Sequence, residues 1–392
     1  MLNTQFTPWP NFSEEEVDAV SAVLRSNKVN YWTGQEGRNF EQEFATYTDC
    51  KYAVAVANGT LALDLALQSL DIGADDEVIV TSRTFIASIS CVINAGATPV
   101  FVDIDCDTQN ITAEFIESAL SNKTKAIICV HLAGWPCEMD EIMTLATENN
   151  LYVIEDCAQA HGAKYKGRSV GSIGHIGAWS FCQDKIMTTG GEGGMLTTNN
   201  ENIWRKAWAF KDHGKSYEAV YEKEHPPGYR WLHESFGTNW RLTEMQSAIG
   251  RIQTARMPEW HNTRVEYANK ILNACNSFHF IHVPEIPSYI EHAFYKCYVF
   301  IKPEQLPKNW SRDAIINAFT EKDIPCYSGS CSEVYLEKAF NDKPYKPRQS
   351  LKNAQQLGET SLMFLVHPTL KGSEIQQTCQ TINDIFTKIA DS

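Results

Sequence analysis

A lysine stands between an apolar segment and a glycine-rich turn near the middle of the chain. Lys185 follows the apolar residues 178–181 and precedes residues 190–194, which contain four glycines. Lysine is rarely buried without a purpose, and partial burial makes its amine easier to deprotonate. A neutral lysine is a nucleophile for aldehydes, and glycines let the backbone pass close to a ligand. We therefore predict that Lys185 is catalytic.

Two adjacent carboxylates, Glu155 and Asp156, directly follow the apolar segment 151–154, which reads as a buried strand. Burying a carboxylate is costly unless it has a partner. Adjacent residues of an extended chain point to opposite sides, so one of the two faces a site at the strand end. Such a carboxylate can hold the N–H of a pyridinium ring. A structural salt bridge is the alternative, and the two residues alone leave both open.

Two other strand ends carry residues suited to a flat, phosphorylated ligand. Gly59 and Thr60 follow the apolar segment 52–56 and open a helical pattern. A helix start offers free backbone N–H groups and a positive dipole to a phosphate, although an ordinary capped helix has the same sequence. Phe85 follows the segment 77–80 and can stack on a ring. A core aromatic is the alternative there.

Each of these motifs is weak alone, but together they indicate one cofactor. A phosphate seat, a stacking aromatic, an acid and a lysine, in that order, match the needs of pyridoxal 5′-phosphate (PLP). No Gly-Lys-Ser/Thr follows the glycines, which excludes a Walker-type phosphate loop. Gly171, Gly174 and Gly177 have the wrong spacing for a dinucleotide fingerprint.

The elements that must position these residues alternate between strand and helix, which predicts an α/β fold with a mainly parallel sheet. Ligands of such sheets lie beyond the carboxyl ends of the strands. Ser13 and Glu16 form a capping box before the first helix. The predicted strands are residues 52–56, 77–80, 99–102, 126–130 and 151–154, and the helices between them are residues 61–70, 86–95, 113–120 and 140–148.

The pattern changes after a long helical segment that begins near Leu242. Strand-like residues 278–283 and 295–301 precede helical patterns at 312–319 and 374–389. We therefore predict a large α/β domain of residues 1–255 and a smaller α+β domain of residues 256–392.

Composition narrows the class of protein further. The chain has 392 residues and a formal net charge of −14, which argues against a nucleic-acid partner. No run of about 20 apolar residues predicts a membrane span, and the N-terminus lacks the features of a secretory signal. The 12 cysteines form no zinc-binding pattern, so reduced thiols and no metal site are expected. A cytoplasmic enzyme fits these features.

Several ordered motifs resemble one family, the DegT/DnrJ/StrS sugar-nucleotide aminotransferases. The resemblance runs from residues 40–45 to residues 365–369. It implies PLP fold type I, in which a mainly parallel sheet of the seven-stranded type lies between helices and a smaller α+β domain follows. The motifs that carry it are residues 58–60, 84–85, 101–103, 131–134, 155–162, 180–181, Lys185 with 191–194, and 237–246.

The resemblance also implies a role for individual residues. Lys185 is the Schiff-base lysine, Asp156 pairs with the pyridine nitrogen, and Gln159 bonds the ring hydroxyl. Phe85 stacks on the ring. The phosphate ligands implied are Gly59, Thr60 and Ser180, with Asn239 reaching in from the neighbouring subunit of a homodimer that shares its active sites.

Family resemblance gives the substrates. L-glutamate is the expected amino donor, and a UDP- or dTDP-linked 4-keto-6-deoxy or 3-keto sugar is the expected acceptor, yielding an amino sugar for surface polysaccharide. A keto-cyclitol such as scyllo-inosose is the alternative acceptor, and a non-catalytic PLP-binding protein is an alternative of another class. The expected substrate-facing residues are Trp32, Thr33, His213 and Arg230.

Overall fold

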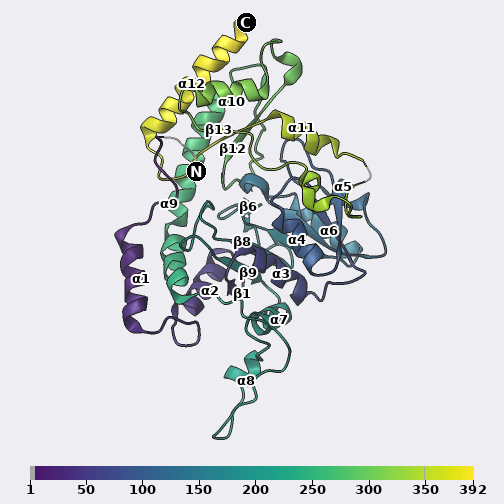
Figure 1. Cartoon of the computed structure of the whole chain (residues 1–392), viewed down its shortest axis with the longest axis vertical. Coiled ribbons are helices and arrows are strands. Elements are labelled where there is room, and N and C mark those ends of the chain that lie inside the picture. The colour runs from purple at the N-terminus through teal and green to yellow at the C-terminus, as the bar shows by residue number, and fades with distance from the viewer. Residues whose placement is uncertain (1–4, 348) are drawn as a thin grey trace.

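A seven-stranded sheet forms the centre of the larger part of the molecule (Figure 1). The computed structural model describes residues 5–347 and 349–392. The strand order is β1-β9-β8-β5-β4-β2-β3, and only β9 runs against the other strands. The prediction of a mainly parallel sheet is confirmed. The strands are β1 Tyr52–Val56, β2 Glu77–Thr81, β3 Thr98–Val102, β4 Thr124–Val130, β5 Tyr152–Asp156, β8 Ile176–Ser180 and β9 Gly194–Thr198.

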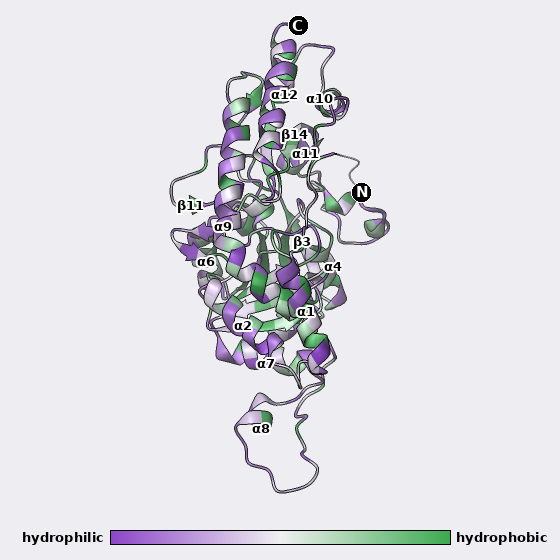
Figure 2. Cartoon of the chain, turned by 90° about the vertical axis from the view of Figure 1, so that its left-hand side faces the viewer, coloured by the Kyte–Doolittle hydropathy of each residue, from purple (hydrophilic) through white to green (hydrophobic). Residues whose placement is uncertain are grey.

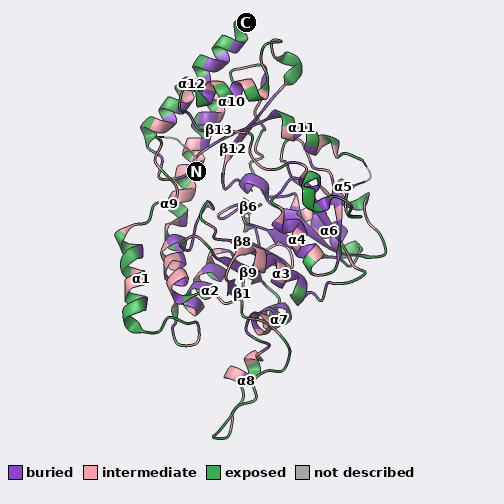
Figure 3. Cartoon of the chain, in the orientation of Figure 1, coloured by how far each residue is buried: buried purple, intermediate pink, exposed green. Residues whose placement is uncertain are grey.

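Helices cover both faces of this sheet. Successive side chains of each strand point to opposite faces, so alternate residues pack into two different hydrophobic cores. In β4, Ala126 and Ile128 pack with the helices of one face, whereas Ile127 and Cys129 pack with those of the other. The first face carries α3 Gly59–Ser69, α4 Ala87–Asn94 and α7 Glu201–Lys211; the second carries α2 Glu36–Tyr47, α5 Ala113–Glu117 and α6 Met139–Glu148. Figure 3 shows these layers buried around the sheet.

The C-terminal part is built on a four-stranded antiparallel sheet of order β10-β12-β14-β13. Its core packs against three helices, α9 Glu244–Cys275, α10 Arg312–Thr320 and α12 Gly372–Ala390, while α11 Lys352–Thr360 precedes β14. The strands are β10 Ile281–His282, β12 Cys297–Ile301, β13 Cys326–Tyr327 and β14 Ser361–Phe364. The α+β character expected of the C-terminal residues matches this arrangement.

Helix α9 belongs to both parts of the molecule. It packs against α1 Glu14–Ser26 and α2 near its start, and against α12 and β12 near its end. The predicted boundary between residues 255 and 256 therefore falls inside a continuous helix, shortly before Pro258. The division into residues 1–255 and 256–392 stays a prediction.

An arm, residues 213–238, projects away from the body in both Figure 1 and Figure 2. It contains the short helix α8 Tyr217–Tyr221. Four of its aromatic side chains are exposed, Tyr221 by 45%, Tyr229 by 76%, Trp231 by 83% and Phe236 by 99%. Exposed apolar side chains of this size are common where proteins contact one another.

Some features were not anticipated from the sequence. Strand β9 was not predicted, nor was the small sheet of order β11-β6-β7, formed by Ile290–Glu291, Lys164–Tyr165 and Arg168–Ser169.

The capping box of Ser13 and Glu16 is present at α1. All 12 cysteines are free. Among the described residues, no helix has the length and apolar character needed to cross a membrane.

Candidate active site

A cavity of about 690 Å³ opens beyond the carboxyl ends of β4 and β5, where a parallel sheet places its ligands. It contains every cofactor residue predicted within one chain: Gly59, Thr60, Phe85, Asp156, Gln159, Ser180 and Lys185. These residues come from loops and strand ends far apart in sequence, so the fold alone brings them together.

The N-terminus of α3 forms one wall of the cavity. The side chain of Asn58 accepts a hydrogen bond from the Leu61 amide at 3.0 Å and caps the helix. Gly59 lies so close to β8 that an added Cβ would stand 2.5 Å from the Cβ of Ser180. The missing side chain lets the helix start approach Ser180, and the first-turn N–H groups have no partner within the helix. An anion fits this position.

Asp156 is the carboxylate that faces the cavity. Its Oδ2 accepts a hydrogen bond from the Ser88 hydroxyl at 2.7 Å, and its Oδ1 accepts one from the Ala158 amide at 3.1 Å. The Ser88 hydroxyl in turn pairs with that of Thr84 at 2.8 Å. These hydrogen bonds fix the direction in which the carboxylate points.

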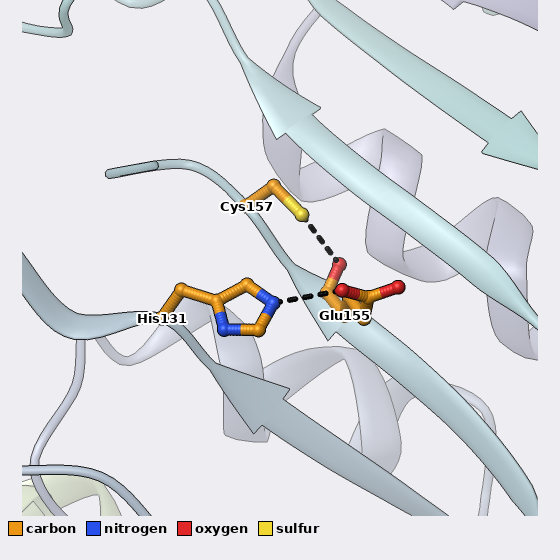
Figure 4. Close-up of side chains that lie close together, drawn as sticks. All are labelled: His131, Glu155 and Cys157. Carbon is orange, nitrogen blue, oxygen red and sulfur yellow. Dashed lines mark hydrogen bonds and ion pairs between the residues drawn. The ribbon is translucent and has the colours of Figure 1, made fainter. Parts of the chain in front are cut away.

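Glu155 points the other way, into a closed hydrogen-bond network (Figure 4). It accepts bonds from Nε2 of His131 at 2.9 Å and from the amides of Gly171, Ile173 and Gly174 at 2.6–2.9 Å. Nδ1 of His131 accepts from the Cys137 amide, so Nε2 carries the proton.

His131, Glu155 and Cys157 are near enough to one another to form a metal-binding set. Both carboxylate oxygens and both ring nitrogens, however, already have hydrogen-bond partners. The cluster is a hydrogen-bond network that holds Glu155, the residue next to Asp156, in place. That the chain uses no metal stays a prediction.

Lys185 lies in the loop after β8, with Nζ 5.2 Å from the centre of the Tyr295 ring. The Tyr295 hydroxyl donates to Oδ2 of the neighbouring Asp184 at 2.5 Å. Burial raises the pKa of Asp184, but the positive charge of Lys185 and the Tyr295 hydrogen bond outweigh burial and hold that pKa below its usual value. Asp184 is therefore an anionic neighbour of the lysine.

Phe85 and Gln159 occupy other walls of the cavity. Phe85 is 68% exposed although it is a large apolar residue, so its ring is available to stack on a ligand. The Gln159 carbonyl accepts from the Ala133 amide at 2.8 Å, which leaves its NH₂ group free to donate. The side-chain amide is thus oriented by its own hydrogen bond.

Five predicted site residues lie outside this cavity. Asn239 is exposed and pairs through its backbone with Asp212 at the base of the arm. Trp32 packs on the ammonium of Lys215 at 4.0 Å. The remaining three, Thr33, His213 and Arg230, are exposed. Their substrate contacts stay predictions for a single chain.

The cavity also contains residues that the sequence did not single out. Ser88, Asp184 and Glu192 line it, with Cys182 beside them. Ser88 follows Phe85 by one helical turn, and Asp184 adjoins Lys185, so their positions in the sequence were available signals. The hydrogen bond from Trp9 to Lys185, described below, joins residues 176 positions apart and had no local signal.

Solved structures of the same shape define the class of protein. The crystal structure of an aminotransferase from Psychrobacter cryohalolentis has a TM-score of 0.97 and 65% sequence identity, covering 98% of this chain and 100% of that one. The fold type I prediction is confirmed, and the chain has the architecture of an aminotransferase.

The chain belongs to the DegT/DnrJ/EryC1/StrS aminotransferase family, whose model matches residues 10–383. It is 33% identical to the GDP-perosamine synthase of Escherichia coli O157:H7, over 96% of this chain and 97% of that protein. It is also 33% identical to the dTDP-3-amino-3,6-dideoxy-alpha-D-galactopyranose transaminase of Aneurinibacillus thermoaerophilus, over 95% of each chain. The predictions of the family and of aminotransferase activity are confirmed.

Proposed function

We propose that this chain binds PLP in the 690 Å³ cavity and moves an amino group from L-glutamate to a nucleotide-linked keto-sugar. The observation that carries the proposal is the meeting of Lys185, Asp156, Phe85 and the Gly59–Ser180 approach in that one space. A lysine, a carboxyl group, an exposed ring and an anion-binding helix start are the groups that PLP requires.

When bound, PLP supplies an aldehyde that takes up amino groups and a cationic ring that accepts electrons from the substrate. The chain supplies the rest. Nζ of Lys185 moves the substrate proton as base and then as acid. Asp156 holds the ring N–H through its free lone pairs, and the start of α3 with Ser180 binds the phosphate. Phe85 covers one face of the ring, and the Gln159 NH₂ bonds its hydroxyl.

The names of the relatives, which include GDP- and dTDP-linked amino sugars, support a nucleotide-linked sugar as the acceptor. For this chain we propose a nucleotide-linked 4-keto-6-deoxy or 3-keto sugar, with UDP and dTDP as the expected nucleotides. Its product would be an amino sugar for surface polysaccharide. A cytoplasmic location fits nucleotide-sugar substrates.

A visible spectrum tests the cofactor and both substrates. Protein reconstituted with PLP is expected to absorb as a lysine–cofactor adduct, to bleach with L-glutamate and to recover with one keto-sugar of a panel carrying UDP, dTDP or GDP. Recovery with scyllo-inosose instead would establish the cyclitol alternative. A band that no amino donor changes would overturn the proposed reaction.

Lys185 is tested separately by substitution. Lys185→Arg keeps the positive charge but lacks a readily deprotonated amine, so it should lose transamination by several orders of magnitude. Lys166→Arg, an exposed lysine paired with Asp140, is the matched control and should keep full activity. Wild-type rates in the PLP-loaded Lys185→Arg protein would contradict the assignment.

We further propose a homodimer in which Asn239 completes the neighbouring active site. The exposed aromatic residues of the arm offer a surface that a second copy can bury. Asn239 lies at the arm's base, and its neighbours Trp240 and Arg241 pair with the end of β1, beside the start of α3.

Mixed subunits distinguish a shared site from a separate one. Lys185→Ala and Asn239→Ala proteins are each expected to be impaired as homodimers. In a mixed dimer with shared sites, one site has both residues intact, so mixing restores activity. If Asn239 acts only within its own chain, no site in the mixture has both residues, and activity stays at the level of the separate variants.

A further inference from the structure

The segment before α1 links the C-terminal part to the loop of Lys185. The Thr7 amide donates to Oε1 of Glu374 at 2.7 Å, and the Thr369 hydroxyl donates to the Pro8 carbonyl at 2.8 Å. One residue further on, the indole N–H of Trp9 donates to the backbone carbonyl of Lys185 at 2.7 Å. A short stretch of chain thus ties the start of α12 to the lysine.

Three neighbours fix the indole in place. Its ring meets the edge of Trp260 at 5.2 Å between centroids, and the ring of His367 at 6.0 Å. The guanidinium of Arg264 lies 5.5 Å from the indole centroid. Burial lowers the pKa of Arg264 to about 9 and that of His367 to about 3, so the histidine is neutral at pH 7. The indole N–H is therefore held in one direction.

The Lys185 carbonyl depends on this bond. The loop between β8 and β9 has four backbone hydrogen bonds of its own, and the one nearest the lysine runs from the Lys185 amide to the Cys182 carbonyl at 3.0 Å. The other three join the Gln183 amide to the Gly191 carbonyl, the Phe181 amide to the Gly193 carbonyl and the Thr189 amide to the Phe181 carbonyl, and none of the four uses the Lys185 carbonyl. Trp9 supplies the single hydrogen bond to the Lys185 carbonyl found within residues 5–347 and 349–392. Without Trp9 the backbone at the lysine has no anchor on that side.

We propose that Trp9 is a positioning residue for Lys185. This inference rests on the proposed function, in which Nζ must release the cofactor and then carry a proton between two atoms. Such a transfer is sensitive to displacements of about 1 Å. An anchored carbonyl limits the arc that Nζ can sweep, and Thr7 and Pro8 fix the anchor to the C-terminal part.

Trp9→Phe tests the anchor, because it keeps an aromatic ring and removes the N–H donor. Trp260→Phe is the matched control: it makes the same change in the partner ring, and no hydrogen bond among the described residues joins Trp260 to the Lys185 loop. Losing one neutral hydrogen bond corresponds to about a fivefold change. Trp9→Phe should therefore speed amide hydrogen exchange in residues 182–189 about fivefold in the cofactor-free protein.

With PLP and glutamate, the saturating rate of the first half-reaction should fall about fivefold in Trp9→Phe. The glutamate concentration giving half that rate should stay within about twofold, because Trp9 does not line the cavity. A loss of packing alone would change both Phe variants alike. Exchange in residues 182–189 that matches wild type, or equal effects in the two variants, would overturn the proposal. Failure of wild-type protein to bind PLP would overturn the proposed function but leave the exchange result to decide on the anchor.

Discussion

Gly59→Ala is expected to weaken cofactor binding sharply. The new methyl carbon would stand 2.5 Å from Cβ of Ser180, 2.9 Å from its Cα and 2.9 Å from its Oγ. The Cα is backbone of β8 and cannot rotate away. Ordinary contact begins near 3.4 Å, so the start of α3 must retreat by about 1 Å, and overpacking of this kind costs about 1–3 kcal/mol.

This displacement moves the N-terminus of α3, which we propose binds the cofactor phosphate. The free-energy cost should therefore raise the dissociation constant of PLP about 5- to 150-fold. A titration followed by visible absorbance measures it. Gly372→Ala is the control, because Gly372 is also the first residue of a helix and its added Cβ would meet nothing within 4 Å. A Gly59→Ala protein that binds PLP as tightly as wild type would refute the reasoning about the seat.

Three other changes test the described contacts. His161 is buried against three aromatic rings, and burial lowers its pKa to about 3. Between about pH 6.5 and pH 3 only the unfolded chain binds a proton at this residue, so the free energy of unfolding falls as the pH falls. His161→Phe should reduce the dependence of that free energy on pH by about 1.4 kcal/mol per pH unit in denaturant titrations, and an unchanged dependence would contradict the argument. Glu155→Gln places an amide NH₂ among N–H donors and should cost about 3 kcal/mol in urea unfolding, whereas exposed Glu291→Gln should cost under about 0.5. Phe236→Ser should raise the dissociation constant of the dimer, measured by sedimentation, at least about tenfold. Tyr152→Ser, on the body of the protein, is the control, and equal dissociation constants for the two variants would place the arm outside the interface.

The strands of the parallel sheet could be predicted closely because strands covered on both faces are continuous runs of Val and Ile. Residues 52–56 were predicted with the bounds that β1 has, and β5 ends two residues beyond the predicted segment. Strand β9 escaped because Gly194–Thr198 contains two threonines and only two large apolar residues, too weak a pattern beside the glycine turn.

The candidate site divides in the same way. Residues at strand ends, such as Asp156 and Lys185, could be predicted because topology alone places them at one edge. The residue that anchors the lysine loop could not, since Trp9 reaches the Lys185 carbonyl through a contact between distant segments. The alternation of Glu155 and Asp156 by itself could not tell which carboxylate faces the cavity, because it is the same in either register; the family resemblance pointed to Asp156, and the structure places Asp156 on that side.

Helix α9 joins the hydrophobic cores of the larger part and the C-terminal part into one cooperative unit. Its first turns pack against α1 and α2 of the larger part and its last turns against α12 and β12 of the smaller part, with no break in the helix between them. A helix shared in this way transmits loosening of either core to the other, so heat should melt the chain in a single calorimetric transition. A fragment ending at residue 255 would retain only the first part of that helix and expose the apolar surface that the rest covers. Cutting the chain there would therefore yield an aggregation-prone piece and not an independent domain.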